Sequence, residues 1–309
     1  MTKLYIVVPC YNEEEVLPIT SKRLAEKLTE LTERGVISPE SRVLMVDDGS
    51  RDATWRLITE LHERDARFCG AKLSRNRGHQ NALLAGLMTA KTRCDCAVSM
   101  DADLQDDVDA VDEMLARFEE GCDVVYGVRS ARETDTAFKR STAQWFYKLI
   151  NAMGGELVYD HADYRLLSRR ALEALSEYGE ANLFLRGIVP MMGYKSAKVE
   201  YRRGERAAGE SKYPLKKMLA FAWEGITSLT ARPITLMMWL GAEMAALAAL
   251  VCVVLAVLDE LEAAGAIICA LAFFSGVNLF GTGLVGQYVG KTYMESKHRP
   301  RYFIEEIVE

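Results

Sequence analysis

Short apolar runs and amphipathic stretches alternate along the first 130 residues of the chain. Five apolar runs are predicted to form buried strands, at residues 4–9, 42–46, 70–73, 96–100 and 124–126. The stretches between them show the pattern of helices, at residues 14–33, 53–64, 81–90 and 108–119. Alternation of strand and helix predicts an α/β domain in which helices cover both faces of a parallel sheet.

The last third of the chain has a different pattern. Two apolar stretches, residues 234–258 and 263–288, are each long enough to cross a hydrocarbon core, which needs about 20 residues. The only charged side chains from residue 233 to residue 290 are Glu243, Asp259, Glu260 and Glu262. We therefore expect two transmembrane helices. A buried hairpin in a soluble domain is the alternative.

Flanking charge predicts how these helices are oriented. Residues 202–232 carry seven basic and three acidic side chains, whereas the connection between the two apolar stretches has no Lys or Arg. The positive-inside rule then places both termini in the cytoplasm and makes the chain a multi-pass protein of the cell inner membrane. Four parts are expected: an α/β domain (1–205), an amphipathic juxtamembrane segment (206–232), a transmembrane hairpin (233–290) and a cytoplasmic tail (291–309).

Composition excludes several classes of protein. Half of the residues are hydrophobic and 27% are charged, which excludes a disordered chain. The net charge of −6 argues against a general nucleic-acid-binding protein, so no nucleic-acid partner is expected. The seven cysteines form no C-x-x-C pair, which argues against a zinc frame or a disulfide scaffold. The first apolar run is too short for a signal peptide, so the first domain is expected to stay in the cytoplasm.

Polar side chains follow the predicted strands at the edge where such sheets bind ligands. Asp101 and Asp103 come directly after the fourth strand. Two carboxylates at this spacing suit one hard cation, Mg²⁺ or Mn²⁺, which would bridge a diphosphate. Strand-end carboxylates with no function are the alternative for this motif taken alone.

Two earlier strands also end in polar groups. After the first strand, Tyr11 suits stacking on a base and Glu13 suits accepting hydrogen bonds, or the segment is a turn before a helix. After the second, Asp47 and Asp48 offer acceptors to a base or ribose, or form a plain turn with Gly49. No G-x-G-x-x-G follows a strand and no P-loop is present, which argues against a dehydrogenase or an NTPase.

Five motifs occur in a fixed order: P-x-Y-N-E-E, D-D-G-S, N-x-G-H-Q, D-A-D-L-Q-D and Y-G-x-R. The stretches around Asp163 and Lys212 and the two apolar stretches follow them. Together they resemble the inverting GT-A glycosyltransferases of family 2, with their Rossmann-like nucleotide-sugar domain. Among these, the chain is most similar to the polyprenyl-phosphate glycosyltransferases, such as bactoprenol glucosyltransferases and dolichyl-phosphate mannose synthase. The resemblance covers nearly the whole chain.

The resemblance implies a role for each matching residue. Residues that hold the donor nucleoside are Pro9, Tyr11, Glu13 and Asp47 or Asp48. Residues that bind the metal and diphosphate are Asp101, Asp103 and Gln105. Residues that close over the diphosphate are Arg206 and Lys212, with Ser211 beside them. Arg129 and Arg140 are expected to face the acceptor phosphate.

Asp163 has the family position of a catalytic base. Because a phosphate monoester is already largely ionised near neutral pH, Asp163 is also a candidate for orienting the acceptor or the arginines, or for pairing with Arg165. The chain departs from the family pattern at Asp107 and Val108, which replace prolines, and at Ala162, which replaces a glycine. Neither departure removes a charged group.

The resemblance implies transfer of one sugar from a nucleotide sugar, UDP-glucose being favoured, to a polyprenyl phosphate such as undecaprenyl or dolichyl phosphate at the inner leaflet. A GDP-mannose-dependent mannosyltransferase and a non-catalytic binding module remain alternatives. A polymerising synthase is disfavoured because the chain has no Q-x-x-R-W motif. The G-x-x-x-G at Gly286 and Gly290 suits helix–helix contact, so a homo-oligomer is expected.

Overall fold

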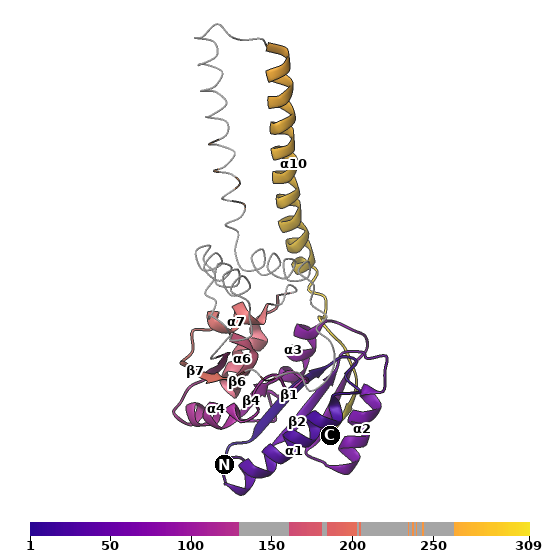
Figure 1. Cartoon of the computed structure of the whole chain (residues 1–309), viewed down its shortest axis with the longest axis vertical. Helices are drawn as coiled ribbons and strands as arrows, with labels where there is room; N and C mark the ends of the chain where they lie inside the picture. The colour runs from indigo at the N-terminus through magenta and orange to yellow at the C-terminus, as the bar shows by residue number, and fades with distance from the viewer. Residues whose placement is uncertain are drawn as a thin grey trace.

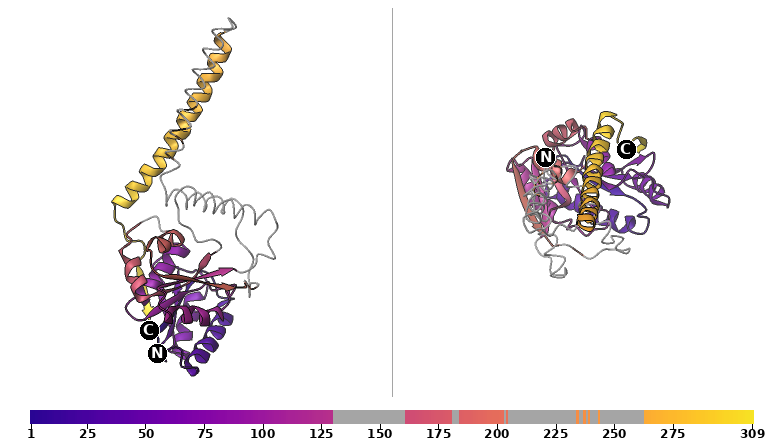
Figure 2. Two further views of the ribbon diagram at one scale, coloured as in Figure 1. Left: turned by 90° about the vertical axis from the view of Figure 1, so that its left-hand side faces the viewer. Right: turned by 90° about the horizontal axis from the view of Figure 1, so that it is seen from above.

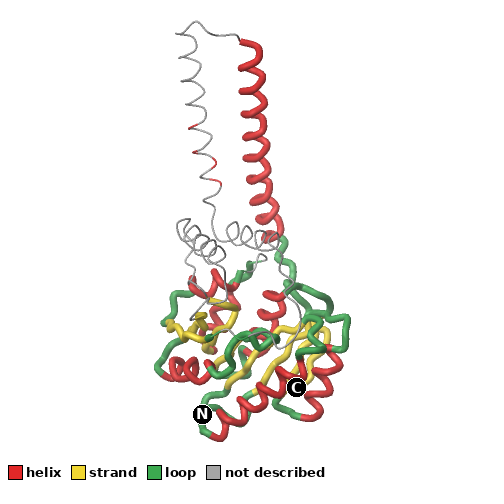
Figure 3. The backbone as a smooth tube through the Cα atoms, in the orientation of Figure 1, coloured by secondary structure: helices red, strands yellow, loops and turns green. Residues whose placement is uncertain are grey.

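The computed structural model describes residues 1–129, 161–180, 184–202, 204 and 263–309, together with the single positions 234, 237, 239 and 243. These residues form one mixed sheet with helices on both faces, and a long helix extends away from it (Figures 1 and 3). The strands are β1 (Leu4–Cys10), β2 (Arg42–Asp47), β3 (Phe68–Leu73), β4 (Cys96–Ser99), β5 (Val124–Arg129), β6 (His161–Ser168), β7 (Ser196–Tyr201) and β8 (Ile304–Val308). The helices are α1 (Leu17–Glu33), α2 (Thr54–Arg64), α3 (His79–Ala90), α4 (Ala110–Glu119), α6 (Arg169–Glu177), α7 (Leu185–Met191) and α10 (Ala263–Ser296).

The eight strands lie in the order β7-β5-β6-β4-β1-β2-β3-β8. β1 pairs in parallel with β2 and β4, and β2 pairs in parallel with β3, as the alternation of elements predicts. The five predicted strands all run parallel, and the two antiparallel strands are ones that the pattern did not predict: β6, inserted between β4 and β5, and β8, beside β3. This insertion brings residues of β6 next to the end of β4.

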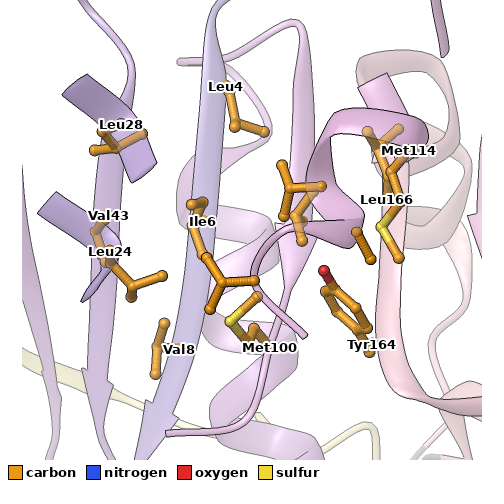
Figure 4. Close-up of a cluster of buried hydrophobic side chains, with 14 of the residues drawn as sticks. Leu4, Ile6, Val8, Leu24, Leu28, Val43, Met100, Met114, Tyr164 and Leu166 are labelled. Carbon is orange, nitrogen blue, oxygen red and sulfur yellow. The ribbon is translucent and has the colours of Figure 1, made fainter. Parts of the chain in front are cut away.

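The central strand β1 is buried on both faces, which explains its unbroken apolar sequence. Leu4, Ile6 and Val8 point towards the face covered by α1, α2 and α4 (Figure 4). Tyr5 and Val7 point to the other face, where α3, α6 and α7 pack. Two cores, one on each face, therefore hold the strand ends in place.

The five predicted strands correspond to β1 to β5, and the four predicted helices to α1 to α4. The largest differences are three residues: β5 ends at Arg129 instead of residue 126, and α1 begins at Leu17 instead of residue 14. There the amides of Val16 and Leu17 both donate to the carbonyl of Glu13, at 3.1 Å and 2.9 Å, which forms a turn before the helix. That turn keeps Glu13 in the loop after β1.

The end of the chain returns to the sheet after α10 (Figure 2). β8 pairs along β3, with Val308 opposite Gly70 and Ile304 opposite Leu73. Residues 304–308, expected in a cytoplasmic tail, are therefore an edge strand. The sequence I-E-E-I-V has charges at consecutive positions and so lacks strand alternation, which is why pattern alone missed it.

Among the helices that the structure describes, none combines the length and apolar character that a membrane crossing requires. The juxtamembrane segment 206–232 lies outside the described residues. So does the first apolar stretch, apart from the positions 234, 237, 239 and 243.

Candidate active site

The carboxyl ends of three parallel strands meet at one edge of the sheet. Cys10 at the end of β1 is in register with Asp47 at the end of β2, and Ser99 at the end of β4 pairs with Val7. The amide of Asp48 donates to the carbonyl of Cys10 at 2.9 Å, which continues the contact beyond the strands. The loops that carry the predicted site residues therefore start from neighbouring points.

The loop after β1 is fixed by the loop after β2. The amide of Asn12 donates to Oγ of Ser50 at 3.0 Å, and the amide of Glu13 donates to Oγ1 of Thr54 at 2.9 Å. Tyr11 lies at the surface of this loop with 42% of its side chain exposed, and Pro9 lies within β1. The exposed ring is available for stacking on a planar ligand.

Asp47 and Asp48 are both buried, but their oxygens have different surroundings. The two oxygens of Asp48 accept hydrogen bonds from the amides of Arg77 and Gly78, at 2.6 Å and 2.9 Å, so this carboxylate holds the loop after β3. Oδ1 of Asp47 accepts from the amide of Ser50 at 3.2 Å, and Oδ2 has no partner among the described residues. Burial raises the pKa of both carboxyls. Of the two, Asp47 has the oxygen that suits a ligand hydroxyl.

Asp101 and Asp103 follow β4 at the same edge. Asp101 is partly exposed, and Oδ1 of Asp103 accepts from the amide of Gln105 at 3.1 Å across a turn in which Leu104 has a φ of 54°. The carbonyl of Gln105 accepts from the amide of Gly204 at 2.9 Å. Within the part of the chain that the structure describes, no three His, Cys, Asp or Glu side chains are grouped closely enough to form a metal site by themselves.

His79 connects the loop after β4 to β6. It begins α3, and its Nε2 lies 3.6 Å from Oδ1 of Asp101 and 3.8 Å from Oδ2 of Asp163. Asp48 sets this position by holding the amides of the two preceding residues. The predicted metal ligand Asp101 and the predicted base Asp163 thus each have an oxygen within 4 Å of the same ring nitrogen of His79.

Asp163 lies in β6 between two arginines. Nη2 of Arg165 lies 2.5 Å from its Oδ1, and Nη2 of Arg186, in α7, lies 3.0 Å from its Oδ2. Burial raises the pKa of Asp163, but the charges of Arg186, Arg165 and His79 outweigh this effect and hold the pKa far below its usual value. The carboxylate is therefore ionised throughout the physiological range and is a weak proton acceptor.

A second buried pair lies beside the first. The hydroxyl of Tyr201 donates to Oδ1 of Asp106 at 2.5 Å, and Nη2 of Arg129 lies 4.0 Å from the same oxygen. Burial, together with the charges of Asp101 and Asp103, raises the pKa of Asp106 to about 6. Burial alone would lower the pKa of Arg129, but Tyr201 and Asp106 raise it overall. Negative charge is therefore concentrated around the loop after β4.

The structure brings together most of the residues predicted from sequence. Those on the shared strand edge or next to it are Pro9, Tyr11, Glu13, Asp47, Asp48, Asp101, Asp103, Gln105, Arg129 and Asp163. Those outside the described residues are Arg140, Arg206, Ser211 and Lys212. Residues that the sequence analysis did not assign a role are His79, Asp106, Arg186 and Tyr201. His79 and Asp106 had a signal, since they lie in N-x-G-H-Q and D-A-D-L-Q-D, whereas Arg186 and Tyr201 become visible only through their contacts.

The sequence profile of glycosyl transferase family 2 matches residues 5–176, which is more than half of the chain and contains the ends of β1, β2 and β4. The chain belongs to this family. It is a glycosyltransferase with an α/β, Rossmann-like GT-A domain, as its motifs predicted.

Relatives resemble the glycosyltransferase over nearly its full length. It is 50% identical to "Uncharacterized glycosyltransferase YkoT" of Bacillus subtilis (strain 168), with 98% of this chain and 91% of the relative covered. It is 35% identical to "Prophage bactoprenol glucosyl transferase homolog" of Escherichia coli (strain K12), with 99% of each covered. Among solved structures, glucosyl-3-phosphoglycerate synthase from Mycobacterium tuberculosis matches at 17% identity and a TM-score of 0.45, over 74% of this chain and 79% of that one. A likeness this weak carries no argument about function.

Proposed function

We propose that the glycosyltransferase moves one glucose from UDP-glucose to a polyprenyl phosphate at the cytoplasmic face of the membrane. The observation that carries the proposal is the juxtaposition of an acidic group at Asp101 and a basic group at Arg186 and Arg165, linked through His79 and Asp163. The acidic group suits a metal-bound diphosphate, and the basic group suits a second phosphate. The name of the Escherichia coli relative supports both the lipid acceptor and glucose.

The donor is proposed to lie across the ends of β1, β2 and β4. Tyr11 stacks on the base, Glu13 accepts a hydrogen bond from the nucleoside, and Oδ2 of Asp47 accepts one from a base or ribose group. The 2′ and 3′ hydroxyls of a ribose need acceptors of this kind, and a buried carboxylate oxygen gains most from providing one. Arg206, Lys212 and Ser211 are proposed to close over the diphosphate, and Arg140 to contact the acceptor.

A divalent cation, Mg²⁺ or Mn²⁺, is proposed to accompany the diphosphate. The donor set fits such an ion, because Asp101 and Asp103 are hard oxygen ligands and concentrate enough negative charge to raise the pKa of Asp106. Asp101, Asp103 and Gln105 would hold the cation together with diphosphate oxygens. When bound, it would stabilise the negative charge that develops on the leaving diphosphate.

The acceptor needs no proton removed before it attacks. Its phosphate monoester has a second pKa of about 6 and is mostly a dianion at neutral pH. A phosphate oxygen forms the new bond to the anomeric carbon, and the bond from that carbon to the nucleoside diphosphate breaks with its electron pair. The acceptor phosphate loses one negative charge and the departing nucleoside diphosphate gains one, so the reaction needs no proton acceptor. The low pKa of Asp163, which makes it a weak base, is consistent with this.

The C-terminal part is proposed to hold the enzyme at the membrane. Apolar side chains on α10 are exposed, including Leu271, Phe273, Phe280 and Val289, and their transfer from water to lipid is favourable. With the apolar stretch 234–258 they are proposed to form the anchor, a hairpin of two helices that also pairs with a second copy. Extraction of membranes with carbonate tests this, because a hairpin stays in the pellet and a peripheral protein is released.

The activity is tested with a panel of nucleotide sugars. Purified full-length protein is given UDP-glucose, other UDP-sugars or GDP-mannose with Mg²⁺ or Mn²⁺, and release of nucleoside diphosphate is measured with and without a short polyprenyl phosphate. We expect UDP release from UDP-glucose that depends on the lipid phosphate. A preference for GDP-mannose would show that the proposed donor is wrong and that the enzyme is a mannosyltransferase. The absence of turnover with every donor would favour a non-catalytic binding module.

A further inference from the structure

The ring of His79 lies beside the proposed metal site but makes no hydrogen bond within the described part of the chain. Its Nε2 is 3.6 Å from Oδ1 of Asp101 and 3.8 Å from Oδ2 of Asp163, whereas a hydrogen bond from a ring N–H needs about 2.7–3.2 Å. The ring of His62 is satisfied by comparison, because its Nδ1 lies 2.7 Å from the carbonyl of Phe68. His79 therefore has a ring nitrogen that is open to a ligand.

The two carboxylates near this nitrogen are engaged differently. Asp163 is buried and is held by ion pairs with Arg165 and Arg186. Asp101 is 43% exposed, and within the described residues the only basic group within 4 Å of its carboxylate is the 42% exposed ring of His79. Asp101 is therefore the oxygen ligand that a cation beside His79 would use.

Backbone contacts fix His79 from both sides. The residue before it, Gly78, donates its amide to Oδ2 of Asp48 at 2.9 Å. The residue after it, Gln80, accepts a hydrogen bond from the amide of Leu185 at 3.0 Å through its side chain. The start of α3 is thus held to the loop after β2 and to α7, so the position of the ring is set before a ligand arrives.

The backbone around Asp101 is fixed in the same way. The amide of Met100 donates to the carbonyl of Val7 at 3.1 Å, and the carbonyl of Ala102 accepts from Oγ1 of Thr20 at 2.6 Å. The carboxylate of Asp101 accepts no hydrogen bond from the described residues, although its backbone is held on both sides. Two fixed backbones therefore present an imidazole nitrogen and a carboxylate oxygen to the same place.

The separation of these two atoms suits a shared cation. Two ligands that each lie about 2.1 Å from one cation are about 3.0 Å apart at a right angle and at most about 4.2 Å apart. The 3.6 Å between Nε2 of His79 and Oδ1 of Asp101 falls in this range. A nitrogen lone pair and a carboxylate oxygen at this distance repel each other, and a cation bound by both removes the repulsion.

We propose that Nε2 of His79 is a ligand of the divalent cation that Asp101 holds, and that this nitrogen makes the site prefer Mn²⁺ and other transition metals to Mg²⁺. The inference rests on the proposed function, because it takes a cation to accompany the donor diphosphate at Asp101. Imidazole binds transition metals, whereas Mg²⁺ prefers oxygen ligands. The proton of the neutral ring then lies on Nδ1. Asp103, Gln105 and diphosphate oxygens would complete the coordination.

Electron paramagnetic resonance tests the ligand directly. Full-length protein is loaded with Mn²⁺ and UDP, and the electron spin echo modulation from a coordinated nitrogen is recorded. A second sample is grown on histidine that carries the heavier nitrogen isotope, which identifies the nitrogen as histidine without any substitution. The variant is H79N, and H298N is the matched control because His298 lies beyond the end of α10. Affinities for Mn²⁺, Co²⁺ and Mg²⁺ and the melting temperature are measured for each protein.

We expect nitrogen modulation in the wild-type protein that changes with the isotope, persists in H298N and is lost in H79N. H79N should bind Mn²⁺ and Co²⁺ about tenfold or more weakly, since loss of even an outer-shell partner of a metal ligand has an effect of that size. Its affinity for Mg²⁺ should fall less, so the preference for Mn²⁺ over Mg²⁺ should decrease. The melting temperature without metal should stay near that of H298N.

Three outcomes would overturn the inference. Mn²⁺ bound to the wild-type protein without histidine modulation would make His79 an ion-pair partner of Asp101. Modulation that persists in H79N would assign the nitrogen to another histidine. An equal loss of Mn²⁺ and Mg²⁺ affinity in H79N would show that the ring does not select the metal. If the wild-type protein binds no cation with UDP or with GDP, the metal in the proposed function fails as well, which is a distinct result.

Discussion

Tyr201 donates a hydrogen bond of 2.5 Å to Asp106, and this contact joins β7 to the loop that carries Asp101 and Asp103. Asp106 is 2% exposed, and burial together with the two neighbouring carboxylates raises its pKa to about 6. The hydrogen bond from Tyr201 opposes that rise because it favours the ionised form. The strand therefore stabilises the negative charge of Asp106 beside the predicted metal ligands.

Replacement of Tyr201 by Phe should raise the pKa of Asp106 further and lower stability by about 2 kcal/mol at neutral pH. The folded pKa of Asp106 already exceeds the usual 3.8, so its ionisation destabilises the fold increasingly as pH rises from about 4 to above 6. Loss of the hydrogen bond raises the folded pKa and extends this decline to higher pH, so the deficit of Y201F should be larger at pH 8 than at pH 4.5. Urea unfolding at both pH values measures it, with Y194F as control. An equal deficit at both pH values would contradict the prediction.

Lys27 lies buried between α1 and α4, with Nζ 3.1 Å from Glu30 and 2.9 Å from Asp109 and a further ion pair to Asp112. Replacement of Lys27 by Met leaves three carboxylates together without their cation. It should lower the free energy of unfolding by about 3 kcal/mol. This is the low end of the range for breaking a buried ion pair, because the carboxylates are partly exposed. Lys22, exposed on the same helix, provides the control variant K22M.

The loss in K27M should depend on pH. The hydrogen bond from Lys27 is the main reason why the pKa of Asp109 lies below its usual value. A lowered carboxyl pKa contributes stability above about pH 4, and this contribution disappears as pH falls through the folded pKa. The difference between K27M and wild type should therefore shrink from pH 7 to pH 3.5. A difference that grows on acidification would disprove the role of the ion pairs.

Gly49 allows the loop after β2 to touch the loop after β3. Its φ is +66°, and a Cβ at this position would lie 2.6 Å from backbone atoms of Arg75 and Asn76. G49A should lower the melting temperature and also reduce turnover, because Asp48 next to it positions the residues before His79. The strain of the left-handed region alone is about 1–2 kcal/mol. G179A, where no atom lies within 4 Å of the added Cβ, should change neither quantity appreciably.

β8 covers the edge of β3 and connects the end of α10 to the domain. Val308 pairs with Gly70, and Glu306 accepts a hydrogen bond of 3.1 Å from the indole of Trp55. Deletion of residues 303–309 should expose the β3 edge, lower the melting temperature and promote aggregation. Light scattering and tryptophan fluorescence measure these effects. E306Q, which keeps an acceptor for Trp55, should behave like wild type, and a deletion that behaves the same way would show that β8 is dispensable.

The N-terminal strands were predictable because each is buried on both faces and is therefore a continuous apolar run. β6 and β8 were not, for opposite reasons. β6 contains Asp163 and Arg165, which are buried as an ion pair that Arg186 also joins, and no apolar pattern reports such a pair. β8 has two consecutive glutamates, and their partners are side chains of other elements: Glu305 pairs with Lys72, and Glu306 accepts a hydrogen bond from Trp55. The pairing of charges in β6 and the position of β8 at the sheet edge arise only when the sheet is assembled, so the local sequence pattern does not show them.

The site divides in the same way. Asp47, Asp101 and Asp103 were predictable because strand ends in parallel sheets meet at one edge. Arg186 was not, because it belongs to a separate helix and its distance from Asp163 is set by how α7 packs against β6. The choice between Asp47 and Asp48 also needed the structure, since it depends on which carboxylate the amides of the loop after β3 reach.

Metal dependence through Asp101 and Asp103 follows from the charge around the loop after β4. The diphosphate leaving group brings additional negative charge to a place where burial and then the charges of Asp101 and Asp103 already raise the pKa of Asp106, so binding without a cation would be strongly opposed. D103N should lower turnover by about a hundredfold or more while the domain stays folded. Titration of Mn²⁺ in the presence of UDP, followed by electron paramagnetic resonance, should show weaker binding in the same variant.

D107N, which changes an exposed carboxylate two residues beyond Gln105, is the matched control and should retain both activity and Mn²⁺ binding. Full activity of the wild-type enzyme in excess EDTA would show that arginines and lysines alone neutralise the diphosphate, and the assignment of these aspartates as metal ligands would be wrong.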